Sequence, residues 1–202
     1  MLTRRSMLVS TLALPLLPET FGETSLPFAA RLAHAARQQI GVTRSYDPAY
    51  IRLDYPMGDV DRATGVCTDV VIRAYRDAFD VDLQQLVHED MKTAFADYPT
   101  IWGLSRPDRN IDHRRVPNLE RFLERQGASL PLPLTLDGWK PGDLYTMRLG
   151  GRLPHIGIVS DRLTGAGHPY VIHNIGGGTQ EEDILGMFDD ERRFRYDVTA
   201  QT

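Results

Sequence analysis

The sequence predicts a protein of the α+β class, with helices in the N-terminal half and an antiparallel sheet in the C-terminal half. Apolar residues first recur at helical spacing, and short apolar segments bounded by turn residues follow. Helices followed by strands are typical of this class, in which the helices pack on one side of the sheet. The 202 residues suit a single domain with a sizeable core.

Four helices are predicted in the N-terminal half. The first covers residues 28–40 and ends at Gly41, because glycine commonly terminates a helix. Residues 42–66 contain two prolines and two glycines and are predicted to form a long ordered loop. The remaining helices cover residues 66–79, 83–95 and 117–126, with Pro117 suited to a first helical turn.

Four strands are predicted next, over residues 143–149, 156–161, 170–175 and 193–198. The turn Lys140-Pro141-Gly142-Asp143 leads into the first of them. The second and third are predicted to form a hairpin around residues 164–167. After the third strand, Thr179 and Glu182 have the spacing of a capping box and predict a short helix.

Residues 1–26 are predicted to be an export signal peptide, so that a single domain covers residues 27–202. Arg4-Arg5 precede an apolar run over residues 7–17, shorter than the roughly 20 residues that a membrane-spanning helix needs. The segment Thr3-Arg4-Arg5-Ser6-Met7-Leu8 also resembles the twin-arginine export signal. The alternatives are an ordinary secretory signal or an uncleaved anchor. We therefore expect an exported, periplasmic protein with no stable membrane span after signal cleavage.

Charge and cysteine content exclude several classes of function. A net charge of −4 provides no basic field for binding nucleic acid. One cysteine excludes an internal disulfide and a cysteine-based zinc cluster, and no cofactor is predicted. The lone thiol belongs to Cys67, and an exported protein meets an oxidising compartment in which an idle thiol is a liability.

Cys67 stands where Gly65-Val66 leads into the second predicted helix. A thiol at a helix N-terminus faces unpaired N–H groups and the positive end of the helix dipole, which lower its pKa and favour the nucleophilic thiolate. The same N–H groups can hold the oxyanion that forms when an acyl carbon is attacked. The alternative is that Cys67 is a small buried hydrophobic residue.

A nucleophilic cysteine needs a base, and usually a third residue that orients the base. Of the six histidines, His155 and His173 stand in or beside apolar strands, where a polar side chain needs a partner. The predicted hairpin places them opposite or nearly opposite each other, close enough for one imidazole to hydrogen-bond the other. A shift of one residue would instead place Asn174 opposite His155. Two histidines that are satisfied separately are the remaining alternative.

These segments resemble the NlpC-like branch of the papain-fold cysteine peptidases. In that branch a cysteine starts a helix, a Pro-Gly-Asp turn starts the sheet, a histidine begins the next strand and a polar residue follows on the strand after. The chain also resembles the bacterial family known as domain of unknown function 1287 over residues 30–197. The motifs that carry this resemblance are Gly41-Val42-Thr43, Tyr46-Asp47-Pro48-Ala49-Tyr50, Gly65-Val66-Cys67-Thr68-Asp69-Val70-Val71, Asp112-His113-Arg114-Arg115-Val116-Pro117-Asn118-Leu119 and His173-Asn174-Ile175-Gly176-Gly177-Gly178-Thr179-Gln180.

The resemblance implies a papain-like fold with Cys67 as nucleophile, His155 as general base and His173 as the residue that orients His155. Asn174 is the alternative third catalytic residue. Typical cell-wall members have an acidic residue directly before the cysteine, whereas here Val66 precedes it and Asp69 follows, which predicts a difference in substrate recognition.

Five residues are candidates for substrate binding. Tyr46 lies where such members place a substrate-binding tyrosine, and Arg114 and its neighbour Arg115 could hold a carboxylate bidentately. The alternative for both arginines is a solvated loop that anchors the fourth helix through Asp112. The full set of candidates is Tyr46, Asp69, His113, Arg114 and Asn174.

The predicted function is that of an exported cysteine amidase or peptidase that cleaves peptidoglycan stem peptides, or another amide substrate, by acyl transfer to water. One alternative is an acyltransferase or esterase acting on a lipid or small molecule. Others are a catalytically inactive envelope binding module, and a metal site formed by Cys67, His155 and His173. The triad interpretation is preferred over a metal site because it also explains the position of Cys67 at a helix start.

Overall fold

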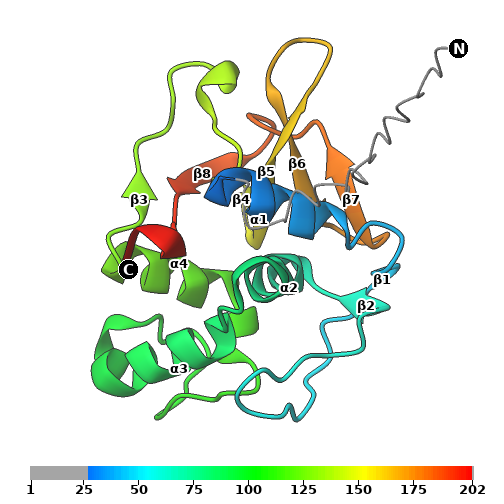
Figure 1. Cartoon of the computed structure of the whole chain (residues 1–202). Coiled ribbons are helices and arrows are strands. Elements are labelled where there is room, and N and C mark those ends of the chain that lie inside the picture. Colours follow the sequence, from blue (N-terminus) through cyan, green and yellow to red (C-terminus); the bar gives the residue numbers. More distant parts are fainter. Residues whose placement is uncertain (1–26, 202) are drawn as a thin grey trace, which may run out of the picture.

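The computed structural model describes residues 27–201 and confirms the α+β class (Figure 1). The predicted export signal, residues 1–26, lies outside the described residues. Four α-helices come first, and a six-stranded antiparallel sheet with the order β3-β8-β4-β5-β6-β7 follows. The helices are α1 (Phe28–Arg37), α2 (Cys67–Phe79), α3 (Leu83–Ala94) and α4 (Val116–Arg125); the strands are β3 (Ser129–Leu130), β4 (Leu144–Leu149), β5 (Leu153–Leu163), β6 (Pro169–Asn174), β7 (Thr179–Glu182) and β8 (Asp189–Phe194).

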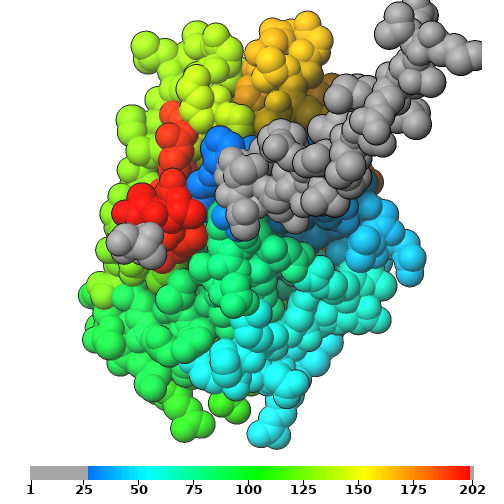
Figure 2. All heavy atoms as spheres, viewed as in Figure 1, coloured from blue at the N-terminus to red at the C-terminus, as the bar shows by residue number. Residues whose placement is uncertain are grey.

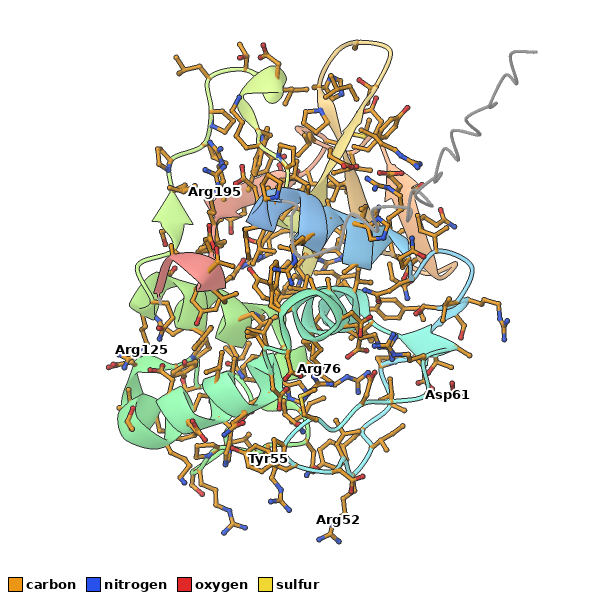
Figure 3. All side chains as sticks on the ribbon, viewed as in Figure 1. Arg52, Tyr55, Asp61, Arg76, Arg125 and Arg195 are labelled. Carbon is orange, nitrogen blue, oxygen red and sulfur yellow. The ribbon has the colours of Figure 1, made fainter. Side chains whose placement is uncertain are left out.

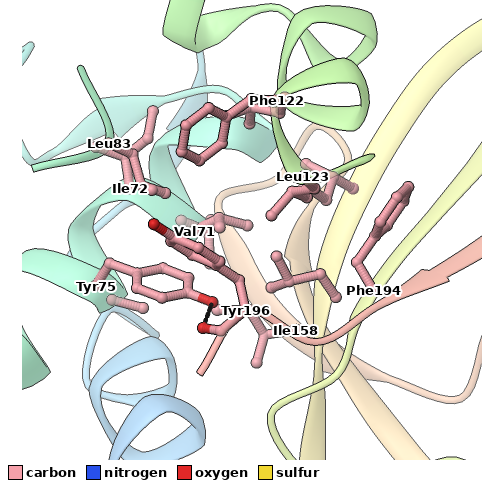
Figure 4. Packing of buried hydrophobic residues seen from close by; sticks show 14 of the residues in the cluster. Val71, Ile72, Tyr75, Leu83, Phe122, Leu123, Ile158, Phe194 and Tyr196 are labelled. Atoms are coloured by element: carbon pink, nitrogen blue, oxygen red, sulfur yellow. Dashed lines mark hydrogen bonds between the residues drawn. The ribbon is translucent and has the colours of Figure 1, made fainter. Parts of the chain in front are cut away.

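The helices pack on one face of the sheet, as the sequence predicts. Successive strand residues point to opposite faces, and on the helical face Ile158 and Phe194 pack with side chains of α2 and α4 (Figure 4). Within this core the hydroxyl of Tyr75 donates a hydrogen bond to the carbonyl oxygen of Tyr196 (2.8 Å). A second apolar cluster covers the other face and comprises Trp139, Tyr145, Met147, Val159, Val171, Ile184 and Leu185.

Helix α2 is almost entirely buried and anchors the long loop before it. Its guanidinium groups reach out to that loop: Arg73 pairs with Asp59 (2.9 Å), and Arg76 donates to the carbonyl oxygen of Gly58 (3.0 Å). Figure 3 labels Arg76 beside α2. The loop contains a small parallel pair, β1 (Ser45–Tyr46) and β2 (Thr64–Gly65), where the sequence predicts no strand. Two buried arginines of α2 therefore hold residues 58–59 of this loop against the helix.

The hairpin of β5 and β6 forms where predicted, but its register differs by two residues. Ile158 pairs with Ile172, so that continuing the register places Gly157 rather than His155 opposite His173. A shift of two residues keeps His155 and His173 on the same face, as diagonal neighbours. The prediction that His155 and His173 share a face, opposite or nearly opposite each other, is therefore confirmed, and the alternative register that would place Asn174 opposite His155 is wrong.

Three other predicted elements differ from the structure. The first helix ends at Arg37, and Ile40, beyond it, is 41% exposed and adds nothing to the apolar stripe. The last strand covers Asp189–Phe194, because the chain then leaves the sheet and Tyr196 packs into the helical core. The segment Thr179–Glu182 is strand β7 rather than a helix, because its backbone pairs with the open edge of β6.

The space-filling view shows two protrusions at the top of the molecule, the loop between β3 and β4 and the tip of the β5–β6 hairpin (Figure 2). His155 lies near the other end of β5 from this tip. Over residues 27–201, no helix combines the length and the apolar character needed to cross a membrane.

Candidate active site

Cys67 is the first residue of α2, and its side chain is buried, with 3% exposed. The preceding residue, Val66, is extended, and its N–H donates to the Asp69 carboxylate (2.7 Å), which closes the first turn of the helix. The thiol is hydrogen-bonded by the backbone of Ile156 and Thr68 and by the side chain of Tyr46. The sulfur therefore contacts residues of three elements, β5, α2 and β1. The residue of β5 that it contacts, Ile156, follows His155 directly in the sequence.

Burial raises the pKa of Cys67 to about 11. Three hydrogen bonds to the sulfur lower this pKa, the largest effect coming from the backbone of Ile156 and the smaller ones from Tyr46 and Thr68. The negative charge of Asp69 raises it further. The direction is opposite to the one expected from the helix N-terminus, because removing a thiolate from water costs more than these donors return. The resting site therefore holds a neutral thiol at neutral pH.

His155 and His173 are hydrogen-bonded to each other, with 2.8 Å between Nε2 of His155 and Nδ1 of His173. Both side chains are buried, at 2% and 0% exposed. Gly157 makes this approach possible, since a Cβ there would lie 2.5 Å from Cγ1 of Val171 and 3.1 Å from Cβ of His173. Burial and then the charge of His173 lower the pKa of His155 to about 3, so its imidazole is neutral at neutral pH.

Glu182 is a member of this group that sequence reasoning missed. Its Oε2 lies 3.0 Å from Nε2 of His173, and 39% of its side chain is exposed. Burial lowers the pKa of His173, and the charge and hydrogen bond of Glu182 counteract that shift. The signal available in the sequence was the alternation of Gln180 and Glu182 along a strand, which a capping-box interpretation hid. Glu182 thus extends the pair of histidines to a row of three side chains, His155, His173 and Glu182, on the face of the sheet that also carries Met147 and Val171. Cys67 reaches the neighbouring residue of the same strand, Ile156.

Asp69 and Arg114 form a buried ion pair next to Cys67. Arg114 donates to both carboxylate oxygens of Asp69, from Nε (3.0 Å) and from Nη2 (2.9 Å). The two side chains are 4% and 2% exposed, and Arg114 also donates to the carbonyl oxygens of Asp47 and Ala49. Their donors and acceptors are therefore used within the protein, and the pair holds the loop after Tyr46 against α2.

Asn174 also holds the site together. Its Nδ2 donates to the carbonyl oxygens of Ser45 (3.2 Å) and Gly65 (3.1 Å), and it is fully buried. These bonds tie the end of β6 to both strands of the small β1–β2 pair. Tyr46, by contrast, is 39% exposed and extends to the thiol. Of the predicted substrate-binding residues, Tyr46 thus has the exposure that contact with a substrate requires.

His113 lies apart from the others, buried at 2% exposed, and Nδ1 has no hydrogen-bond partner within the described chain. Burial, followed by the charges of Arg76 and Arg114, lowers the pKa of His113 to about 3. The structure does not bring it to the cavity beside Cys67. Its lowered pKa instead makes the stability of the folded protein depend on pH.

We expect the stability of the protein to fall as the pH falls from about 6.5 towards 3. The folded protein keeps His113 and His155 neutral, whereas the unfolded chain binds protons below its ordinary pKa of 6.5, so acid favours unfolding. His113→Leu is expected to weaken this dependence without abolishing it, because His155 remains. Urea unfolding at pH 7 and pH 4.5 measures the effect, and equal pH dependence in both proteins would contradict it.

A cavity of about 380 Å³ opens beside Cys67. Tyr46, Arg114, Arg115 and Trp102 contribute to its wall. The guanidinium carbon of Arg115 lies 4.1 Å from the centre of the Trp102 ring, and its Nη1 donates to Asp112 (3.2 Å). Arg115 therefore meets the prediction of an anchor through Asp112 and also faces the cavity. Within the described part of the chain, no group of His, Cys, Asp or Glu residues is arranged to hold a metal ion.

The chain matches a family model, a curated relative and solved structures. The family model described as Domain of unknown function (DUF1287) matches residues 33–196. "Uncharacterized protein YijF" of Escherichia coli (strain K12) is 50% identical over 184 residues, which cover 91% of this chain and 89% of that protein. The solved "Structure of NlpC1 from Trichomonas vaginalis" is similar with a TM-score of 0.43 and 14% identity; the match covers 84% of this chain, which spans 44% of that one.

Proposed function

The chain belongs to the family described as Domain of unknown function (DUF1287), a description that names no reaction. From the geometry of the site, we propose that the protein is a cysteine hydrolase that cleaves amide bonds. The membership confirms the resemblance to this family that the sequence motifs indicate. One observation carries the proposal. A thiol at the start of a helix is hydrogen-bonded to the backbone beside His155, whose imidazole is itself held by a second histidine. Nucleophile, base and orienting residue are the parts that thiol catalysis needs.

The reaction begins with neutral groups. Nε2 of His155 is occupied by His173, so Nδ1 is the nitrogen that takes the proton of the Cys67 thiol as the sulfur attacks the carbonyl carbon. No hydrogen bond joins the thiol to His155 in the described structure, and such catalytic contacts often tighten only when substrate binds. Proton transfer within the site avoids a free thiolate, which the raised pKa of Cys67 disfavours.

The oxyanion is stabilised by donors at the start of α2. The N–H of Cys67 is among the first N–H groups of the helix, which have no partner within it, and the hydroxyl of Tyr46 lies at the sulfur. The C–N bond then breaks, and protonated His155 gives its proton to the leaving amine. Water attacks the thioester and its proton passes to His155. As the C–S bond breaks, protonated His155 returns that proton to the sulfur, so the carboxylic acid product leaves and the neutral thiol is restored.

Peptidoglycan stem peptides are the substrates that we propose. They present amide bonds close to free carboxylates, and Arg115 offers a guanidinium at the wall of the cavity that contains Cys67. Burial lowers the pKa of Arg115, which indicates a partly desolvated cation, and such a cation binds a carboxylate more strongly than a solvated one. Trp102 holds the guanidinium in place by stacking.

Arg115→Ala is expected to raise KM for a stem peptide with a free carboxylate by about 10-fold or more, since charge-assisted hydrogen bonds are worth about 1.5–3 kcal/mol. Initial rates with that peptide and with its carboxamide form measure the effect. The variant should lose the preference for the free acid. Arg121→Ala, at an exposed position of α4, serves as the control. A preference retained by Arg115→Ala would exclude this role.

Digestion of defined muropeptides by the purified full chain, with products identified by mass spectrometry, tests the proposed function. Cleavage of an amide bond supports it. Turnover of acyl esters without amide cleavage would favour an esterase or acyltransferase, and no turnover of either class would favour an inactive binding module. The periplasmic location is a proposal that rests on residues 1–26. Cell fractionation with and without Arg4-Arg5→Lys-Lys tests it, and a cytoplasmic wild-type protein would overturn it.

A further inference from the structure

We propose that Glu182 is a positioning residue of this site: its carboxylate holds a proton on Nε2 of His173 and thereby leaves Nδ1 of His155 unprotonated and able to accept the thiol proton. The inference rests on the proposed function only for its catalytic consequence. The tautomers themselves are properties of the resting protein and can be measured without a substrate.

Two short contacts connect the three side chains. Nε2 of His173 lies 3.0 Å from Oε2 of Glu182, and Nδ1 of His173 lies 2.8 Å from Nε2 of His155. The strands explain the first contact, because β7 pairs with β6 so that Glu182 is opposite Val171. Glu182 and His173 are therefore diagonal neighbours on one face, within reach of long side chains.

The proton positions follow from the chemistry of the three groups. An ionised carboxylate can only accept a hydrogen bond, so Nε2 of His173 carries the proton in the contact with Glu182. A neutral imidazole has a single N–H, which leaves Nδ1 of His173 as an acceptor. Nε2 of His155 must then donate to it, and the lone pair of a neutral His155 is on Nδ1. A carboxylate that sets the tautomer of a functional histidine is a common arrangement in proteins.

Without Glu182 the opposite arrangement becomes available. His173 can carry its proton on Nδ1 and donate it to Nε2 of His155, which places the proton of His155 on Nδ1. That tautomer cannot take the thiol proton. Nε2 of His173 is buried and has no aligned hydrogen-bond partner in the described chain, and the Glu182 carboxylate 3.0 Å away is the acceptor that we propose for its proton. The charge of that carboxylate also favours the imidazolium that forms on His155, through the hydrogen bond between the two histidines.

Asp183→Asn provides a matched control. Asp183 is the next residue along the chain and lies 2.7 Å from Nε2 of His168, and it is not part of the site. It therefore offers a second carboxylate–histidine contact from the same segment. Glu181 is unsuitable, because it holds Arg37, Ser160 and Arg162.

The first test reads the tautomers of the wild type, Glu182→Ala, Glu182→Gln and Asp183→Asn by nitrogen-15 NMR of labelled histidines at neutral pH. His155→Gln and His173→Gln assign the two signals. We expect the Nε2-protonated form at both residues in the wild type and in Asp183→Asn, and loss of that form in Glu182→Ala. A wild type with the proton on Nδ1 of His173, unchanged tautomers in Glu182→Ala, or the same change in Asp183→Asn would overturn the proposal.

The second test is kinetic and uses the amide substrate cleaved by the wild type. Glu182→Ala is expected to lower kcat by about 10–100-fold with little change in KM, whereas Glu182→Gln, whose amide oxygen can still accept, retains more activity. Thermal unfolding shows whether each variant is folded. Equal kcat in Glu182→Ala and wild type would overturn the catalytic consequence. A wild type without any hydrolysis refutes the proposed function and leaves the tautomer test in force.

Discussion

Cys67→Ala is expected to lower the rate of amide hydrolysis by at least about 10³-fold. The variant lacks the sulfur that we propose forms the acyl-enzyme, and the remaining donors at the start of α2 can only polarise the carbonyl. Secondary structure should be unchanged, because alanine suits the first turn of a helix and the lost sulfur leaves only a small void. Initial rates by mass spectrometry and circular dichroism of the same preparations measure the two effects.

Cys67→Ser is the matched variant for this test, since it retains a hydrogen-bonding atom of similar size at the same position. Its hydroxyl is a far weaker nucleophile with His155 as base, and its activity should also be near background. Activity close to wild type in Cys67→Ala, with the fold intact, would refute a thiol mechanism. Loss of activity in Cys67→Ala but not in Cys67→Ser would instead indicate a structural role of this side chain.

Arg114→Met is expected to reduce the free energy of unfolding by about 3–5 kcal/mol, the range for removal of one partner of a buried ion pair. The carboxylate of Asp69 would keep its hydrogen bond from Val66 and lose both bonds to the guanidinium. The carbonyl oxygens of Asp47 and Ala49 would lose their donor as well. Urea unfolding of the wild type and the variant measures the difference.

The double variant Asp69→Asn/Arg114→Met separates charge from packing. Removing both charges avoids the uncompensated carboxylate, so the double variant should be less destabilised than the sum of the two single variants. Arg62→Met at the exposed Arg62–Asp77 pair, whose side chains are 47% and 35% exposed, is the control and should cost at most about 1 kcal/mol. Equal losses at the buried and the exposed pair would contradict this account.

The arrangement of helices before strands follows from the sequence, because the periodicity of apolar residues depends on the local backbone conformation. The position of Cys67 at the start of a helix has the same origin: Gly65 and the apolar stripe of α2 are local signals. The shared face of His155 and His173 is also predictable, since strand alternation tolerates a register error of two residues. Strand β7 was not predictable in this way, because four polar residues become a strand only beside the open edge of β6.

Long-range contacts decide the remaining properties of the site. Arg114 is 45 residues from Asp69 along the chain, and the pairing depends on how the loop before α4 packs on α2. The contact of Glu182 with His173 likewise depends on the pairing of β7 with β6. The pKa of Cys67 also depends on segments that are distant along the chain. A helix start predicts a lowered value, and burial beneath strands β1 and β5 raises it to about 11.

The sequence by itself determined the fold class and singled out Cys67, His155 and His173 as candidate residues, because these depend on residue type and local periodicity. Only the tertiary structure decided the register between the histidines, the carboxylate behind them, the internal use of Asp69, Arg114 and Asn174, and the protonation of the resting thiol. The physical reason is that desolvation and ion pairing depend on which distant segments surround a group, whereas helix and strand signals depend on its neighbours in the chain.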